Sequence, residues 1–162
     1  MVTIRIATLN DTKKLLDCYV EIWESLREWL PDSFINPEVK SVRKPEGIER
    51  FKQGMGSVDG IYLVAEQNKE MVGLLTGREH GGVGNIGFLG VRKQHRREGI
   101  AAALLDKFFE KARERKAHKV WLYTAPQLLP AIELYINNGF VPEGYLRKHT
   151  HGLDLIIYSR FL

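Results

Sequence analysis

The chain has 162 residues, of which 44% are hydrophobic and 27% are charged, a balance typical of a single globular domain. Its 24 Lys and Arg are interspersed with 20 Asp and Glu, and the small net charge of +4 without a single-sign tail argues against a nucleic-acid partner. The one cysteine, Cys18, excludes an intrachain disulfide and is expected in the core. No signal peptide is evident and no apolar run reaches the ~18 residues of a membrane span, so we expect a cytoplasmic protein without membrane contact.

The first part of the chain predicts one strand and two helices. Residues 3–8 have the pattern of a short edge strand. Apolar side chains then recur at helical spacing over residues 15–30, and Pro31 is expected to end that helix. Residues 31–44 have the composition of a loop, and a short helix is expected over residues 45–54.

The remainder predicts six more strands and two helices. We expect strands at residues 61–66, 71–78, 86–91, 120–123, 140–145 and 153–161, and helices at residues 98–116 and 129–138. The strand–helix–strand unit from Ile86 to Tyr123 implies one parallel crossover in an otherwise antiparallel sheet. The expected fold class is α/β of the α+β type, a mixed and mostly antiparallel central sheet flanked by helices, in one domain over residues 1–162.

A basic loop between a strand and a helix gives the clearest signal for a ligand. The loop carries Arg92, Lys93, Arg96 and Arg97, and Arg suits phosphate geometry. The helix that follows starts with unpaired amides and the positive end of its dipole, which together can hold a pyrophosphate. Gly99, without a Cβ, lets a ligand approach the backbone closely. On its residues alone, the segment fits a basic solvated turn equally well.

Two motifs in this sequence are similar to those of a known family. Arg96, Gly99 and Ala101 fill the three defined places of Gln/Arg-x-x-Gly-x-Gly/Ala, and the segment resembles motif A of the GNAT superfamily of N-acetyltransferases. Residues 131–140, Ala-Ile-Glu-Leu-Tyr-Ile-Asn-Asn-Gly-Phe, resemble the second signature, Ala-x-x-Leu-Tyr-x-x-x-Gly-Phe. The resemblance covers nearly the whole chain. It implies a GNAT-like acyl-CoA N-acyltransferase fold and an N-acetyltransferase that uses acetyl-CoA as co-substrate and no metal.

The resemblance also implies where acetyl-CoA binds. The strands at residues 86–91 and 120–124 should splay apart, with the pantetheine pairing along the first and the pyrophosphate on the amides of the basic loop. Tyr135 matches the family tyrosine that protonates the departing CoA thiolate, and it is the expected catalytic residue. The residues expected to bind the cofactor are Leu89, Gly90, Val91, Arg96, Arg97, Glu98, Gly99, Ile100, Ala101, Ala102, Leu128 and Ala131.

Two departures from the family pattern leave the catalytic base open. Leu128 stands where members often have Asn, and residues 85–91 contain no carboxylate where many members carry a Glu base. An amine must lose a proton before it attacks the thioester, and Glu66, Glu79, His80 or a water are the candidates to accept it. The departures also motivate an alternative function, a sensor module that binds acetyl-CoA without turnover.

The acceptor amine is open as well. A peptide N-terminus, a polyamine, a lysine and a small amine all fit direct attack on the thioester. The resemblance places substrate choice in the first two helices and their loop, where an aromatic and acidic lining is offered by Trp29, Asp32, Phe34 and Glu38. Residues 144–152 look loosely like the ends of peptide N-terminal acetylases. Family members often dimerise, so a homodimer is an expectation too.

Two further patterns are expected to carry no chemistry. Residues 82–87 spell Gly-x-Gly-x-x-Gly, but the segment that follows has the pattern of a strand rather than the helix a dinucleotide site requires. His149 and His151 lack a third clustered ligand, so we expect a surface pair rather than a metal site.

Overall fold

The computed structural model describes residues 1–162 and contains one seven-stranded sheet in the order β1-β2-β3-β4-β5-β7-β6. The strands are β1 (Val2–Ile6), β2 (Gly60–Gln67), β3 (Glu70–His80), β4 (Val83–Val91), β5 (Lys119–Thr124), β6 (Val141–Thr150) and β7 (Leu153–Phe161). The helices are α1 (Thr12–Glu24), α2 (Asp32–Ser41), α3 (Pro45–Gly56), α4 (Ile100–Glu114) and α5 (Leu129–Asn137). All neighbouring strands are antiparallel except β4 and β5, which confirms the predicted mixed sheet with one parallel crossover.

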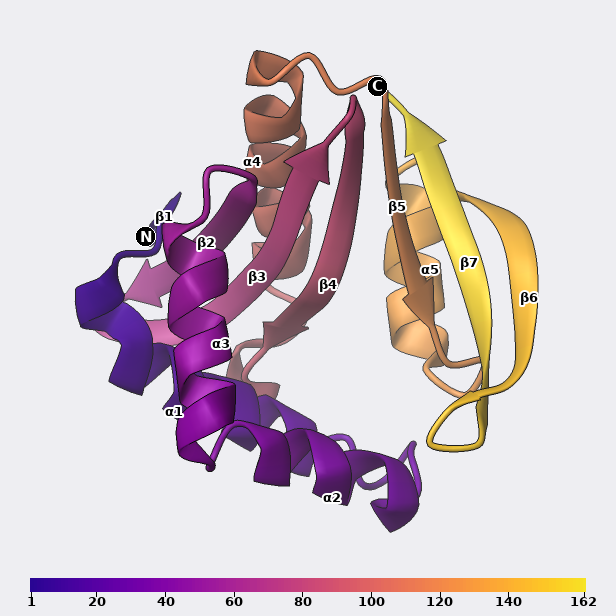
Figure 1. The fold of residues 1–162 in the computed structure, drawn as a ribbon, viewed down its shortest axis with the longest axis horizontal. Helices are drawn as coiled ribbons and strands as arrows, with labels where there is room; N and C mark the ends of the chain where they lie inside the picture. Colours follow the sequence, from indigo (N-terminus) through magenta and orange to yellow (C-terminus); the bar gives the residue numbers. More distant parts are fainter.

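Helices cover both faces of the sheet because side chains alternate along its strands. Leu63 of β2 belongs to the core formed with α4, and its neighbour Val64 belongs to a second core formed with α1 and α3. Phe108 and Phe109, both fully buried, anchor α4 on the first face. Figure 1 shows α4 and α5 behind the sheet and α3 in front of β2. None of these helices is long and apolar enough to cross a membrane.

The parallel pair at the centre of the sheet parts after a short common stretch. β4 and β5 pair only at Val83–Lys119, Gly84–Val120 and Asn85–Trp121. Beyond that point β4 stays paired with β3, and β5 stays paired with β7, so the two strands diverge. Figure 1 shows the resulting opening, which widens towards α1 and α2.

The loop expected over residues 31–44 is instead largely helical, and the first helix ends at Glu24 rather than at Pro31. Burial explains α2, because Phe34, Ile35 and Val39 pack in one cluster with Ala125 after β5 and Leu155 of β7. This tertiary packing overrides Pro37, which lies inside the helix. We call residues 25–41 the bridging segment, because they connect α1, on one side of the opening, to the β5–β7 side.

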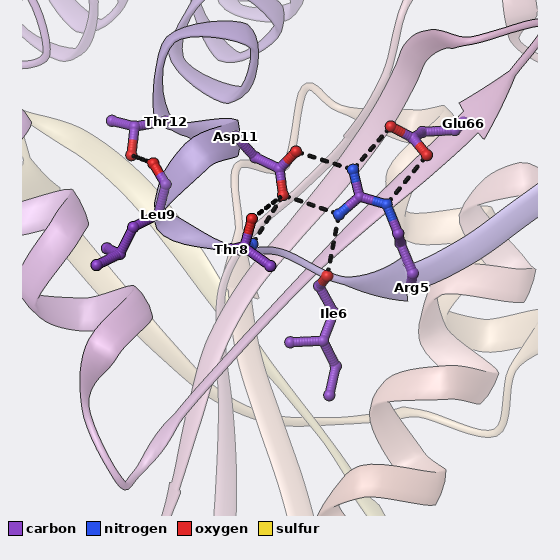
Figure 2. A network of polar contacts seen from close by, with 7 residues as sticks. All are labelled: Arg5, Ile6, Thr8, Leu9, Asp11, Thr12 and Glu66. Carbon is purple, nitrogen blue, oxygen red and sulfur yellow. Dashed lines mark hydrogen bonds and ion pairs between the residues drawn. The ribbon is translucent and has the colours of Figure 1, made fainter.

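An ion-pair network fastens the N-terminal strand to the rest of the fold (Figure 2). The guanidinium of Arg5 donates two hydrogen bonds of 2.8 Å to Asp11, before α1, and bonds of 2.8 and 3.0 Å to Glu66 on β2. Asp11 also accepts the Thr8 amide at 2.7 Å. These contacts hold the pKa of Asp11 well below its usual range, chiefly through the Arg5 hydrogen bonds.

Candidate active site

A cavity of about 650 Å³ occupies the opening between β4 and β5. Its walls come from β4, the start of α4, α5, and the α1–α2 region. The expected cofactor residues that line it are Leu89, Gly90, Val91, Arg96, Arg97, Gly99, Ile100, Ala101, Ala102, Leu128 and Ala131. Glu98 is the one member of the expected set outside the lining. The splayed strands therefore bring together residues that are distant in the sequence.

The loop before α4 presents a row of free amides to this cavity. The backbone N–H groups from Arg97 to Ala102 donate to no acceptor within the protein, because the first helical bond here runs from the Ala103 amide to the Gly99 carbonyl. Gly99 has a φ of +78°, which favours glycine, and a Cβ there would meet no atom within 4 Å. Free amides at the positive end of a helix dipole form an anion site.

Arg96 and Arg97 have different surroundings. Arg96 donates from Nε to the Val91 carbonyl at 3.2 Å and from Nη2 to Ser25 Oγ at 2.5 Å. Its side chain thus fastens the loop to the end of β4 and to the residue after α1. Arg97 is 84% exposed, with its guanidinium 3.9 Å from Glu133 of α5. Of the two side chains, that of Arg97 is free to approach a phosphate at the mouth of the cavity.

Tyr135 lies on α5 with its side chain buried against Phe140 and Tyr158, and it lines the cavity. No hydrogen bond from the protein reaches its hydroxyl. Burial raises the pKa of Tyr135 above its usual value, because the phenolate would be poorly solvated there. The group therefore keeps its proton at neutral pH and can give it to an anion that forms nearby.

None of the three side chains expected as candidate bases lines the cavity. Glu66 is held by Arg5, at the β1 side of the sheet. Glu79 accepts the Gly82 amide at 2.8 Å, and His80 lies 3.2 Å from Asp59. Glu79 and His80 lie at the end of β3, beside the part of β4 that is still paired with β5. They are therefore away from the opening. The sequence predicts where these strands end, but it does not predict at which end β4 and β5 separate.

The acidic and aromatic lining expected for the acceptor is present in part. Trp29, Phe34 and Glu38 line the cavity, whereas Asp32 lies outside it and pairs with Arg27 at 2.5 Å. Glu38 accepts a 3.4 Å hydrogen bond from the Tyr19 hydroxyl and lies 3.4 Å from His151 Nε2.

Sequence reasoning missed two neighbours of Glu38. Tyr19 falls within the apolar helical pattern of residues 15–30, which gives no sign of its hydroxyl contact. His151 comes from the turn between β6 and β7, far along the chain, and no local pattern points to its contact with α2. His149 and His151 belong to no cluster of three His, Cys, Asp or Glu. Gly84 and Gly87 of the Gly-x-Gly-x-x-Gly pattern lie inside β4, and no helix follows them directly.

A mixed sheet that opens around a cavity, with an anion-binding loop at the cavity mouth, defines the class of acyl-CoA N-acyltransferase folds. The sequence profile of the acetyltransferase (GNAT) family matches residues 23–140, and the chain belongs to that family. The resemblance stated from the two motifs is thereby confirmed. No curated protein matches the chain.

Solved structures share the fold over its full length. PaiA N-acetyltransferase from Thermoplasma acidophilum, in complex with coenzyme A, has a TM-score of 0.87 at 15% identity, covering 100% of this chain and 99% of that one. The ribosomal-protein-S18-alanine N-acetyltransferase from Escherichia coli has a TM-score of 0.74 at 19% identity, covering 99% and 94%. The ribosomal-protein-alanine N-acetyltransferase from Brucella melitensis has a TM-score of 0.70 at 26% identity, covering 99% of both chains.

Proposed function

We propose that this acetyltransferase acts as a single domain that moves the acetyl group of acetyl-CoA to a primary amine by direct attack. The observation that carries the proposal is the row of free amides from Arg97 to Ala102 at the mouth of the cavity. A pyrophosphate finds several hydrogen-bond donors along such a loop. We also propose that the protein is cytoplasmic.

The residues around the cavity fit acetyl-CoA in a second way. Beyond Asn85, the edge of β4 that faces β5 has no partner strand, so backbone groups of Leu89 to Val91, apart from the Val91 carbonyl that accepts from Arg96, are available to an extended pantetheine. Leu128 and Ala131 supply the apolar wall on α5. When bound, acetyl-CoA supplies a thioester whose carbonyl carbon a neutral amine attacks. The residues of the chain bind acetyl-CoA, exclude water from the cavity and transfer protons.

Tyr135 is the proposed general acid. Tyr135 lines the cavity, and its buried hydroxyl, which has no hydrogen-bond partner in the protein, holds its proton at Oη. A proton delivered from there neutralises the sulfur that leaves when the thioester bond breaks. The phenolic form suits this role, because a group that ionised at neutral pH would have no proton to give.

Acetyl-CoA consumption across a panel of amines tests the proposal. The panel contains a short peptide, a polyamine, a lysine derivative and small alkyl and arylalkyl amines, and thiol release is measured with each. We expect release above the rate of hydrolysis with at least one amine, and acetyl-CoA binding by calorimetry without any. Binding with no release from any amine would support the sensor module instead, and no binding would refute the site.

A further inference from the structure

The cavity continues past the cofactor walls into a compartment lined by α1, α2, Thr150 at the end of β6 and Leu155 of β7. We propose that Glu38 binds the ammonium group of the acceptor there and accepts its proton before the neutral amine attacks the thioester, and that the compartment selects a primary monoamine with an apolar body. This inference rests on the proposed function, whose acceptor it specifies.

Glu38 is held in place by residues from three different elements. The Tyr19 hydroxyl of α1 donates to Glu38 Oε2 at 3.4 Å, and His151 Nε2 of the β6–β7 turn lies 3.4 Å from Oε1. The side chain is 25% exposed and lines the cavity. The carboxylate is therefore oriented but still accessible, as a binding group must be.

No Lys or Arg pairs with Glu38, which distinguishes it from the other carboxylates of the cavity. Glu28 lies 3.6 Å from Lys93, and Glu133 lies 3.9 Å from Arg97. Both of those acids thus face the basic loop of the cofactor side. A partly buried carboxylate without a Lys or Arg partner favours a ligand that brings the positive charge.

The walls beside Glu38 are aromatic. Tyr19 and Phe88 have ring centroids 4.5 Å apart, and Trp23 lies 5.5 Å from Phe88 and 5.7 Å from Phe34. All four rings line the cavity. Such walls bury an alkyl or aryl group.

One carboxylate against an apolar wall defines the acceptor class. A single ammonium at Glu38 leaves the body of the amine to pack on the four rings. A second ammonium on a polyamine would lie against those rings without a carboxylate of its own. The compartment therefore favours alkyl and arylalkyl monoamines over polyamines.

Amine binding to the protein saturated with CoA tests this inference without turnover. The probes are 2-phenylethylamine, the neutral 2-phenylethanol and 1,4-diaminobutane, each titrated by calorimetry into the wild type and Glu38→Gln. We expect the wild type to bind 2-phenylethylamine about tenfold more tightly than the alcohol, as one charged hydrogen bond provides, and more tightly than the diamine. Glu38→Gln should lose the preference for amine over alcohol while keeping its affinity for CoA.

Glu49→Gln is the matched control, because Glu49 is an exposed residue of α3 outside the cavity. It should bind all three probes as the wild type does. Equal binding of amine and alcohol, unchanged preference in Glu38→Gln, tighter binding of the diamine, or no binding of any probe would each overturn the inference. Failure of the proposed function is a separate outcome, because it appears as absent thiol release while these binding measurements still report on Glu38.

Discussion

At the scale of single residues, burial decides what Tyr135 can do. Its ring packs against two aromatic neighbours, and the raised pKa keeps the hydroxyl protonated well into the alkaline range. A tyrosine on the surface could also donate a proton, but its hydroxyl would not be held in one direction.

Tyr135→Phe should lower kcat by about a hundredfold, since the leaving thiolate loses its proton donor, with little change in the dissociation constant of acetyl-CoA. Steady-state kinetics with a productive amine and calorimetry with CoA measure the two effects. Tyr145→Phe serves as the control, because Tyr145 of β6 lies outside the cavity. An unchanged kcat in Tyr135→Phe would remove this residue from the mechanism.

The motif residues can be predicted from the sequence, but the sequence does not show every contact that requires the residue type found there. Gly90 was expected beside the pantetheine, and it does line the cavity. A Cβ at Gly90 would also stand 2.7 Å from Ile22 Cγ2, so the missing side chain lets α1 approach β4. A contact between segments so far apart leaves no local pattern in the sequence.

At the scale of elements, the start of α4 is the feature on which cofactor binding depends. The predicted helix and strand on either side of the basic loop are both present, because strong apolar periodicity specified each of them. The bridging segment was missed for the opposite reason. Its helix α2 contains a proline, and the packing that stabilises it lies on distant strands.

Gly99→Ala should weaken acetyl-CoA binding and also destabilise the fold by about 1–2 kcal/mol, the cost of an L residue in the left-handed region. The control is Gly81→Ala, since Gly81 has a φ of +61° with no atom within 4 Å of a Cβ and lies in the β3–β4 turn. Both variants should lose similar stability in urea unfolding. If calorimetry then shows the same CoA affinity for both, the backbone of Gly99 does not contact the cofactor.

At the scale of the whole molecule, the Arg5 network makes stability depend on pH. Its contacts lower the pKa of Asp11 and, less strongly, that of Glu66 below their usual values. A carboxyl with a lowered folded-state pKa stabilises the fold above its unfolded-state pKa, 3.8 for Asp11. That stabilisation is lost as the pH falls, because the unfolded chain then binds protons that the folded chain does not.

Arg5→Met should cost about 1–3 kcal/mol at neutral pH, since Asp11 is left buried without its partner. Urea unfolding from pH 7 to pH 3 should also show a smaller loss of stability on acidification than in the wild type. Lys13→Met is the control, because the Lys13–Asp17 pair is exposed and such pairs contribute less than about 1 kcal/mol. Parallel pH profiles for wild type and Arg5→Met would show that the network does not govern acid unfolding.

The bridging segment has a consequence for how such a molecule can diversify. It contributes Trp29, Phe34 and Glu38 to the cavity, while the amides that face a pyrophosphate belong to the loop before α4. The two groups of residues lie in separate stretches of the chain. Natural variation in the bridging segment can therefore change which molecule is acetylated while the donor site is inherited intact, so one donor can serve many acceptors across descendants of a common ancestor.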